Sequence, residues 1–82
     1  RGRRMSQVKV QFKTPEEVMD FTNVVSKYDY NMDLKKSSRK VVDAKSLLGI
    51  LALGLENNLE LCIYSDEDCS EVVNAIGKYV VA

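Results

Sequence analysis

Four short segments constrain the fold of this chain most strongly, and in three of them polar and apolar residues alternate. Alternation with a period of two places polar and apolar side chains on opposite faces of a β-strand. The segments are Gln7–Phe12, Tyr30–Lys35, Arg39–Asp43 and Leu59–Tyr64. Each strand is therefore predicted to bury one face and expose the other, as in an antiparallel sheet that is covered on one side.

Helix signals fall between the strands. Thr14 is predicted as the N-cap of a first helix over Pro15–Lys27, with Glu17 reaching back in a capping box. The turn at Lys36–Ser38 is predicted to join the second and third strands in a hairpin.

Two further helices are predicted. One spans Leu47–Leu53 after Ser46 and ends at Gly54 in a left-handed conformation. The last follows an acidic lead-in at 65–68, with Asp68 and Glu71 as a capping pair. Its expected buried stripe consists of Cys69, Val72, Val73, Ile76 and Val80.

The resulting order, β-α-β-β-α-β-α, predicts an α+β fold. We expect an open-faced β-sandwich, with a four-stranded antiparallel sheet and three helices on one face. With 82 residues the chain holds one domain, expected over residues 5–82. Arg1–Arg4 precede Met5, and either a tag, an upstream translation start or a native basic arm accounts for them. Without Arg1, Arg3 and Arg4 the formal net charge falls from zero to −3, since 9 basic residues face 12 acidic ones.

The sequence contains no histidine. This excludes histidine-based acid–base catalysis, phosphohistidine chemistry and histidine-ligated metal. No nucleophile–base pair or glycine-rich phosphate loop is present either, so we expect no enzyme activity, cofactor or metal. Cys62 and Cys69 match no metal or redox spacing and are interpreted as reduced thiols. Because no membrane span or signal peptide is visible, a cytoplasmic protein is expected.

Two charged clusters have unremarkable interpretations. Lys35, Lys36, Arg39 and Lys40, with Tyr28 and Tyr30 nearby, raise the idea of nucleic-acid binding. The acidic body of the chain favours a solvated turn instead. Asp66, Glu67 and Asp68 lack the ligand spacing of a calcium loop, and helix capping explains them better.

Ser46 has two interpretations. The structural one is an ordinary helix N-cap. The functional one is a phosphoacceptor, because phosphate at this position gains from free backbone N–H groups and the helix dipole. The helix after Ser46 is almost entirely apolar, so it is either wedged between the sheet and another helix or exposes a patch for a partner.

The segment Ala44–Leu55 resembles the second-helix segment of HPr, the histidine phosphocarrier of the bacterial sugar phosphotransferase system. The resemblance is closest to the Gram-positive form and covers nearly all of residues 5–82, because the order of elements also fits. Asn74–Ile76 in the last helix fits the family pattern too. The resemblance implies that Ser46 corresponds to the regulatory serine, which HPr kinase/phosphorylase phosphorylates. It also implies that Leu47, Leu48 and Leu51 contact a LacI-type catabolite regulator.

The chain departs from that family where the catalytic histidine should stand. The loop after the first strand is shortened, and Thr14 or Pro15 occupies the position nearest the histidine. Glu16 stands where the family has an arginine, which reverses the charge, and Asp43 adds negative charge near Ser46. Phosphoryl transfer needs a nucleophile with a transferable phosphoryl bond and positive charge beside it.

The sequence therefore predicts a non-catalytic HPr-like protein, regulatory or vestigial, that binds proteins and not nucleic acid or membrane. Ser46 is its expected switch, and Thr14 and Pro15 take no part in phosphoryl transfer. The alternative is a structural domain that keeps only the fold and self-associates as a homo-oligomer. A phosphocarrier that uses a different residue is the third possibility.

Overall fold

The computed structural model describes residues 5–65 and 68–81. The basic arm expected at 1–4, and Asp66 and Glu67 of the expected acidic lead-in, lie outside the described residues. The elements in chain order are β1 (Met5–Val10), α1 (Pro15–Val25), β2 (Asn31–Ser37), β3 (Lys40–Asp43), α2 (Leu47–Leu53), β4 (Leu59–Tyr64), α3 (Ser70–Ala75) and a short 3-10 helix, η1 (Gly77–Tyr79).

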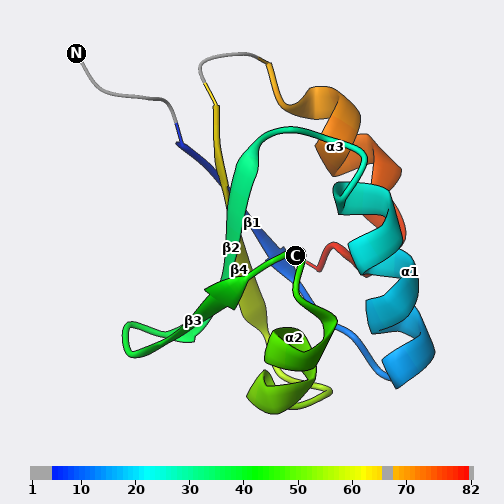
Figure 1. The fold of residues 1–82 in the computed structure, drawn as a ribbon, viewed down its shortest axis with the longest axis vertical. Coiled ribbons are helices and arrows are strands. Elements are labelled where there is room, and N and C mark those ends of the chain that lie inside the picture. The colour runs from blue at the N-terminus through cyan, green and yellow to red at the C-terminus, as the bar shows by residue number, and fades with distance from the viewer. Residues whose placement is uncertain (1–4, 66–67, 82) are drawn as a thin grey trace.

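The strands form one antiparallel sheet in the order β1-β4-β2-β3. Strand alternation aligns apolar residues across the sheet: Val8 pairs with Leu61, Leu61 with Leu34, and Leu34 with Val42. Figure 1 shows α1, α2 and α3 on one side of the sheet, and the row faces them, because Leu61 and Leu34 are buried in the core that the helices cover. The predicted open-faced β-sandwich is therefore confirmed.

The core lies between the inner face of the sheet and the helices. Its largest fully buried side chains come from both layers, including Phe21 of α1, Ile50 of α2 and Leu61 of β4. Burial of such side chains stabilises a fold by roughly 1.5–3 kcal/mol each. The apolar periodicity that predicts the elements is thus the pattern that packs the two layers together.

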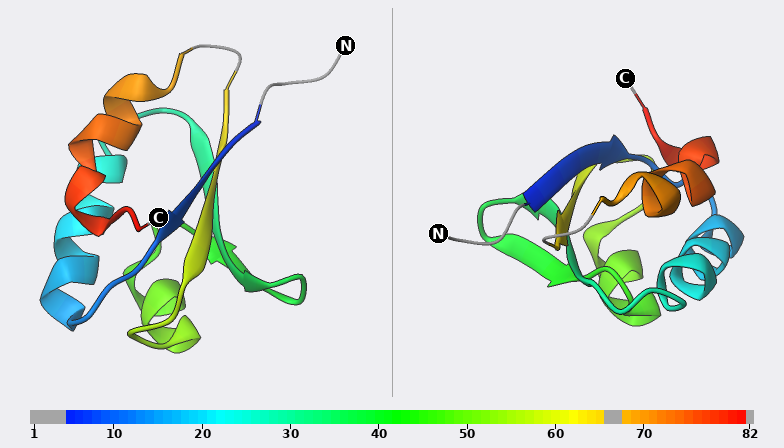
Figure 2. Two further views of the ribbon diagram at one scale, coloured as in Figure 1. Left: turned by 180° about the vertical axis from the view of Figure 1, so that it is seen from behind. Right: turned by 90° about the horizontal axis from the view of Figure 1, so that it is seen from above.

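No helix of the described residues covers the other face of the sheet (Figure 2). One row there comprises Lys9, Glu60, Lys35 and Val41. The next row contains Cys62, which is fully buried, and its Sγ accepts a 3.9 Å hydrogen bond from Gln7 Nε2. These two rows are mostly polar, as predicted, and Cys62 and Val41 are their apolar members.

Several element boundaries differ from the sequence prediction, among them the end of the second strand and the end of the first helix. β2 continues to Ser37, because an irregularity in the β2–β3 pairing between Lys35 and Ser37 shifts the register before the turn. The turn therefore falls on Ser38 and Arg39. The first helix ends at Val25, with Ser26 as its C-cap, and does not reach Lys27.

The last helix is shorter than its apolar stripe predicts. α3 stops at Ala75, and after η1 the backbone of Val80 forms a β-bridge with Val10. Two backbone hydrogen bonds flank the bridge, from Gln11 N to the Tyr79 carbonyl and from Val81 N to the Lys9 carbonyl. Val80 is therefore drawn to the edge of β1, and a helix cannot continue through it.

The predicted capping pair of the last helix is wrong. Asp68 Oδ1 accepts hydrogen bonds from the backbone and the hydroxyl of Ser70. The N-cap is Cys69, which makes no side-chain capping bond. Asp68 thus bonds two residues ahead in a local turn, and it is not the N-cap of α3.

Two other expectations concern cysteines and membranes. Cys62 and Cys69 are buried thiols and form no disulfide with one another. Within residues 5–65 and 68–81, no helix has the length and apolar content that crossing a bilayer requires.

Candidate functional site

Thr14 begins α1 in extended backbone conformation, with φ −136° and ψ 157°. Its Oγ1 accepts a 3.2 Å hydrogen bond from Glu17 N, and Pro15 occupies the first turn. The Glu17 carboxylate accepts a 2.8 Å bond from Lys13 N. The predicted capping box is therefore half confirmed, because Glu17 reaches the residue before the cap and not Thr14 itself.

Backbone hydrogen bonds from two other segments hold the connection between β1 and α1 in place. Gln11 N donates to the Tyr79 carbonyl at 3.0 Å, and Glu56 N donates to the Phe12 carbonyl at 2.7 Å. Phe12, predicted as the last inward residue of the first strand, lies beyond β1 but is buried, with its ring 4.9 Å from that of Phe21. This short connection leaves Thr14 and Pro15 exposed at the start of α1.

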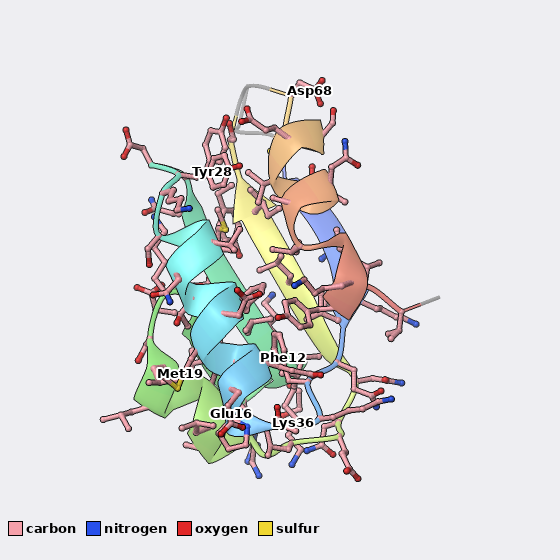
Figure 3. The ribbon with its side chains drawn as sticks, turned by 90° about the vertical axis from the view of Figure 1, so that its right-hand side faces the viewer. Phe12, Glu16, Met19, Tyr28, Lys36 and Asp68 are labelled. Carbon is pink, nitrogen blue, oxygen red and sulfur yellow. The ribbon has the colours of Figure 1, made fainter. Side chains whose placement is uncertain are left out.

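The charge at this helix start is acidic. Glu16 and Glu17 lie in the first turn of α1, and Figure 3 shows Glu16 at the end of the helix. An anionic side chain stabilises a helix N-terminus but repels a phosphoryl group. The Thr14 hydroxyl oxygen caps the helix by accepting from Glu17 N. The first turn of α1 therefore combines two carboxylates with a threonine cap.

Ser46 is the N-cap of α2, as predicted. Its Oγ accepts a 3.2 Å hydrogen bond from Gly49 N, and its carbonyl accepts a 3.0 Å bond from Ile50 N. Gly49 supports this arrangement, because a Cβ there would lie 3.1 Å from Ser46 Oγ and 3.2 Å from Val42 Cβ. Sequence reasoning missed this role of Gly49, which only its spacing of three from Ser46 could have signalled.

The surroundings of Ser46 carry both signs of charge. Ser46 N donates to the Asp43 carbonyl at 3.0 Å, so the exposed Asp43 is close by, as the sequence predicts. Asp43 Oδ1 accepts a 2.9 Å bond from Lys45 N. The Lys45 ammonium extends away to the carbonyl of Tyr28, at 2.6 Å. The Lys45 ammonium therefore joins the segment just before α2 to the segment that follows α1.

The leucines and the isoleucine of the apolar second helix differ in burial. Ile50 and Leu53 are buried, and Leu47 and Leu51 are partly buried against the core. Leu48 alone of the helix leucines stands out, with 78% of its surface exposed. Of the three residues predicted to contact a partner, Leu48 is thus the one that is widely accessible.

Another apolar side chain is exposed on α1. Met19 is 49% exposed and lies on the side of α1 nearer β3 and α2 in Figure 3. The helices α1 and α2 are also in contact with one another. Met19 was not predicted as a site residue, because helical spacing alone places it beside the buried stripe.

A polar cluster joins α1 to the C-terminal segment. The Tyr79 hydroxyl donates to Asp20 Oδ2 at 2.5 Å, and Lys78 Nζ lies 3.6 Å from the same oxygen. Burial and this hydrogen bond raise the pKa of Tyr79 to about 12. The hydrogen bond from Tyr79, with the charge of Lys78, lowers the pKa of Asp20.

No group of three or more metal-ligating side chains occurs within residues 5–65 and 68–81. The basic residues of the β2–β3 hairpin are exposed or half-buried, and two of them, Lys35 and Lys36, line a hollow together with Lys9.

Comparison with known proteins places the chain in a family. The PTS-HPr family model, described as the PTS HPr component phosphorylation site, matches residues 17–82. No curated protein sequence matched. The match begins just after the segment in which Thr14 and Pro15 stand.

Solved structures agree on the fold. A phosphocarrier protein HPr from Bacillus anthracis str. Ames is similar with a TM-score of 0.68 and 22% identity, over 94% of this chain and 98% of that one. HPr-C-His from Thermoanaerobacter tengcongensis is similar with a TM-score of 0.66 and 23% identity, over 92% of this chain and 88% of that one. With the family model covering most of its length, the chain belongs to the PTS-HPr family.

Proposed function

We propose that this chain is a non-catalytic, regulatory member of the PTS-HPr family. It binds protein partners in the cytoplasm and carries no phosphohistidine. The observation that carries this proposal is the start of α1. There the sequence has no histidine, the Thr14 hydroxyl caps the helix, and Glu16 supplies negative charge.

A phosphoester on Thr14 would not replace the missing histidine. A carrier must pass its phosphoryl group onward, and a threonine ester is too stable a bond for that exchange. The phosphoryl group in transit also needs positive charge, and the first turn of α1 offers Glu16 and Glu17 instead.

We propose Ser46 as the regulatory switch of the protein. In the reaction, Ser46 Oγ attacks the γ-phosphorus of ATP, its proton passes to a general base of the kinase, and the bond to the leaving ADP breaks. The ester oxygen keeps the lone pairs that accept from Gly49 N, so the start of α2 need not unfold. The product carries about −1.5 to −2 charge beside Asp43 and the exposed Leu48.

The proposed partners are an HPr kinase/phosphorylase and a LacI-type regulator. The exposed Leu48 supplies an apolar contact next to the new charge. A partner that combines an apolar pocket with basic side chains would then bind the phosphorylated form more tightly than the free hydroxyl form.

Phosphorylation by a Gram-positive HPr kinase/phosphorylase with ATP tests the switch. Intact-mass spectrometry should show one phosphoryl group on the wild type and none on Ser46→Ala. Ser38→Ala, which removes an exposed serine in the β2–β3 turn, is the matched control and should be phosphorylated like the wild type. Equal phosphorylation of Ser46→Ala, or none of the wild type, would remove Ser46 as the switch.

Self-association is the second candidate function, favoured by the exposure of Leu48 and Met19. In that case the apolar surface would be covered by another copy of the chain. Light scattering at increasing concentration separates the two. A dimer that Leu48→Asp disrupts would favour self-association, whereas a monomer throughout would favour the regulatory function.

A further inference from the structure

A hollow of about 340 Å³ lies on the open side of the sheet, where β1, β4 and the β2–β3 hairpin meet. This volume is at the lower end of the range for small-molecule sites. Its lining residues are Lys9, Lys35, Lys36, Ser37, Ser38, Asn58, Leu59 and Glu60. The hairpin beside it extends away from the helices, as Figure 1 shows.

Strand register explains why lysines from two different strands meet here. Lys9 of β1 and Lys35 of β2 both pair with Glu60 of β4, one on each side of it. All three side chains therefore lie on the open face of the sheet. Glu60 alone cannot neutralise the two ammonium groups that flank it.

The third lysine is brought in by the irregularity in β2. The β2–β3 register shifts between Lys35 and Ser37, so Lys36 is the residue at the shift. A bulge interrupts strict alternation and redirects a side chain. As a result, Lys36 lines the same hollow as its neighbour Lys35, whereas a regular strand would send the two to opposite faces.

The charges of the hollow are not paired with one another. None of Lys9, Lys35 and Lys36 forms an ion pair with any carboxylate of residues 5–65 and 68–81, where the ion pair found is Lys78 with Asp20. Three ammonium groups and one carboxylate leave a formal charge of +2 in a chain whose net charge is −3 without the first arginines. The positive charge is therefore local and faces solvent.

The uncharged lining adds hydrogen-bond donors. Ser37 and Ser38 offer hydroxyl groups, and Asn58 offers an amide. Lysine binds phosphate as a point charge, and hydroxyl and amide donors complete the binding of phosphate oxygens. We propose that this hollow binds a small phosphate-bearing anion, a site separate from Ser46 and independent of the function proposed above.

Titration with inorganic pyrophosphate, followed by amide NMR at low ionic strength, tests this proposal. The amide signals of Ser37, Ser38 and Asn58 should shift and saturate, and added salt should weaken the binding. Shifts that never saturate, or that spread equally over all the lysines of the chain, would overturn the proposal.

Two charge variants should change the affinity for pyrophosphate in opposite directions. Lys36→Gln should weaken pyrophosphate binding roughly tenfold, the usual scale for losing one hydrogen bond to a charged group. Glu60→Gln should strengthen it, because the only carboxylate of the hollow loses its charge. Lys27→Gln is the matched control, since Lys27 is exposed at the end of α1 and should leave the affinity unchanged. An equal loss in Lys27→Gln, or weaker binding by Glu60→Gln, would contradict a local site.

Two further ligands define the chemical class. Citrate, a carboxylate of comparable charge, should bind more weakly than pyrophosphate, and equal binding would overturn the assignment to phosphate. A short single-stranded oligonucleotide that bound the same residues more tightly than pyrophosphate would overturn the assignment to a small molecule.

Discussion

Tyr79 and Asp20 lie 59 positions apart and are joined by a 2.5 Å hydrogen bond from the Tyr79 hydroxyl to Asp20 Oδ2. The bond fastens η1 to the middle of α1. The Tyr79 ring also packs in the core, 5.4 Å from the ring of Phe12. The same residue thus holds the C-terminal segment and the connection that leads into α1.

This pair predicts how stability depends on pH. The pKa of Tyr79 is raised to about 12, so its contribution is complete below pH 10 and is lost as the pH rises towards 12. The pKa of Asp20 is lowered from 3.8, so its contribution is present above that pH and is lost as the pH falls through the lowered value.

Removing the hydroxyl tests the pair. Tyr79→Phe should lower Tm by several degrees at neutral pH, and its difference from the wild type should shrink below pH 3.8 and above pH 10. Tyr28→Phe removes a hydroxyl from a ring that stacks on Tyr30 and should leave Tm unchanged. A loss in Tyr79→Phe that is constant with pH would show that the hydrogen bond is not its source.

Replacement of glycine by alanine should have opposite effects on stability at Gly54 and at Gly77. Gly54, the C-cap of α2, has a φ of +95°, and the sequence also predicts a positive φ there. A Cβ at this position would lie 2.9 Å from Asn57 Nδ2. Gly54→Ala should lower the free energy of unfolding by about 1–3 kcal/mol. Gly77→Ala meets nothing within 4 Å and should leave stability unchanged or raise it by about 0.4–1 kcal/mol. Urea denaturation compares the two, and an equal loss in both would contradict the strain at Gly54.

Thr14 is predicted to act only as a cap. Thr14→Ala removes the acceptor for Glu17 N and should cost about 1 kcal/mol of stability in urea denaturation. The rate of Ser46 phosphorylation should stay the same, because Thr14 has no role there. Loss of phosphoryl uptake in folded Thr14→Ala would instead give the start of α1 a chemical role.

Leu48 is predicted to separate binding from stability. Leu48→Asp changes an exposed side chain in the first turn of α2 and should alter stability by no more than about 0.5 kcal/mol. It should abolish binding of the phosphorylated chain to a LacI-type regulator in surface plasmon resonance. Val41→Asp places the same charge on an exposed apolar residue of β3 and serves as the matched control. If both variants bound equally well, the apolar contact through Leu48 would be excluded.

Local signals predicted much of the fold. The bounds of α2 and its cap at Ser46 are as predicted, because capping residues and helical spacing act within a few positions. The end of the last helix was missed, since β1 draws Val80 into a bridge 70 residues away in sequence. The contact of Tyr79 with Asp20 could not be predicted from the sequence either, because the residues near each of them give no sign of the other.

The candidate sites also divide into those that local sequence signals predict and those that depend on the packing of the fold. Ser46 and Thr14 were identifiable from their capping patterns. The exposure of Leu48 relative to Leu47 and Leu51 was not, because all three are leucines on one short helix and only the packing distinguishes them. The hollow beside Lys36 needs both the sheet order and the register shift in β2, which no single segment specifies.

Mapping the phosphorylated residue distinguishes a regulatory chain from a phosphocarrier. The chain is incubated with the general phosphotransferase enzyme and phosphoenolpyruvate, and separately with HPr kinase/phosphorylase and ATP, and each product is mapped by mass spectrometry under conditions that preserve acid-labile bonds. We expect no phosphoryl group from phosphoenolpyruvate and one, on Ser46, from ATP. An acid-labile phosphoryl group from phosphoenolpyruvate at any residue would contradict this expectation.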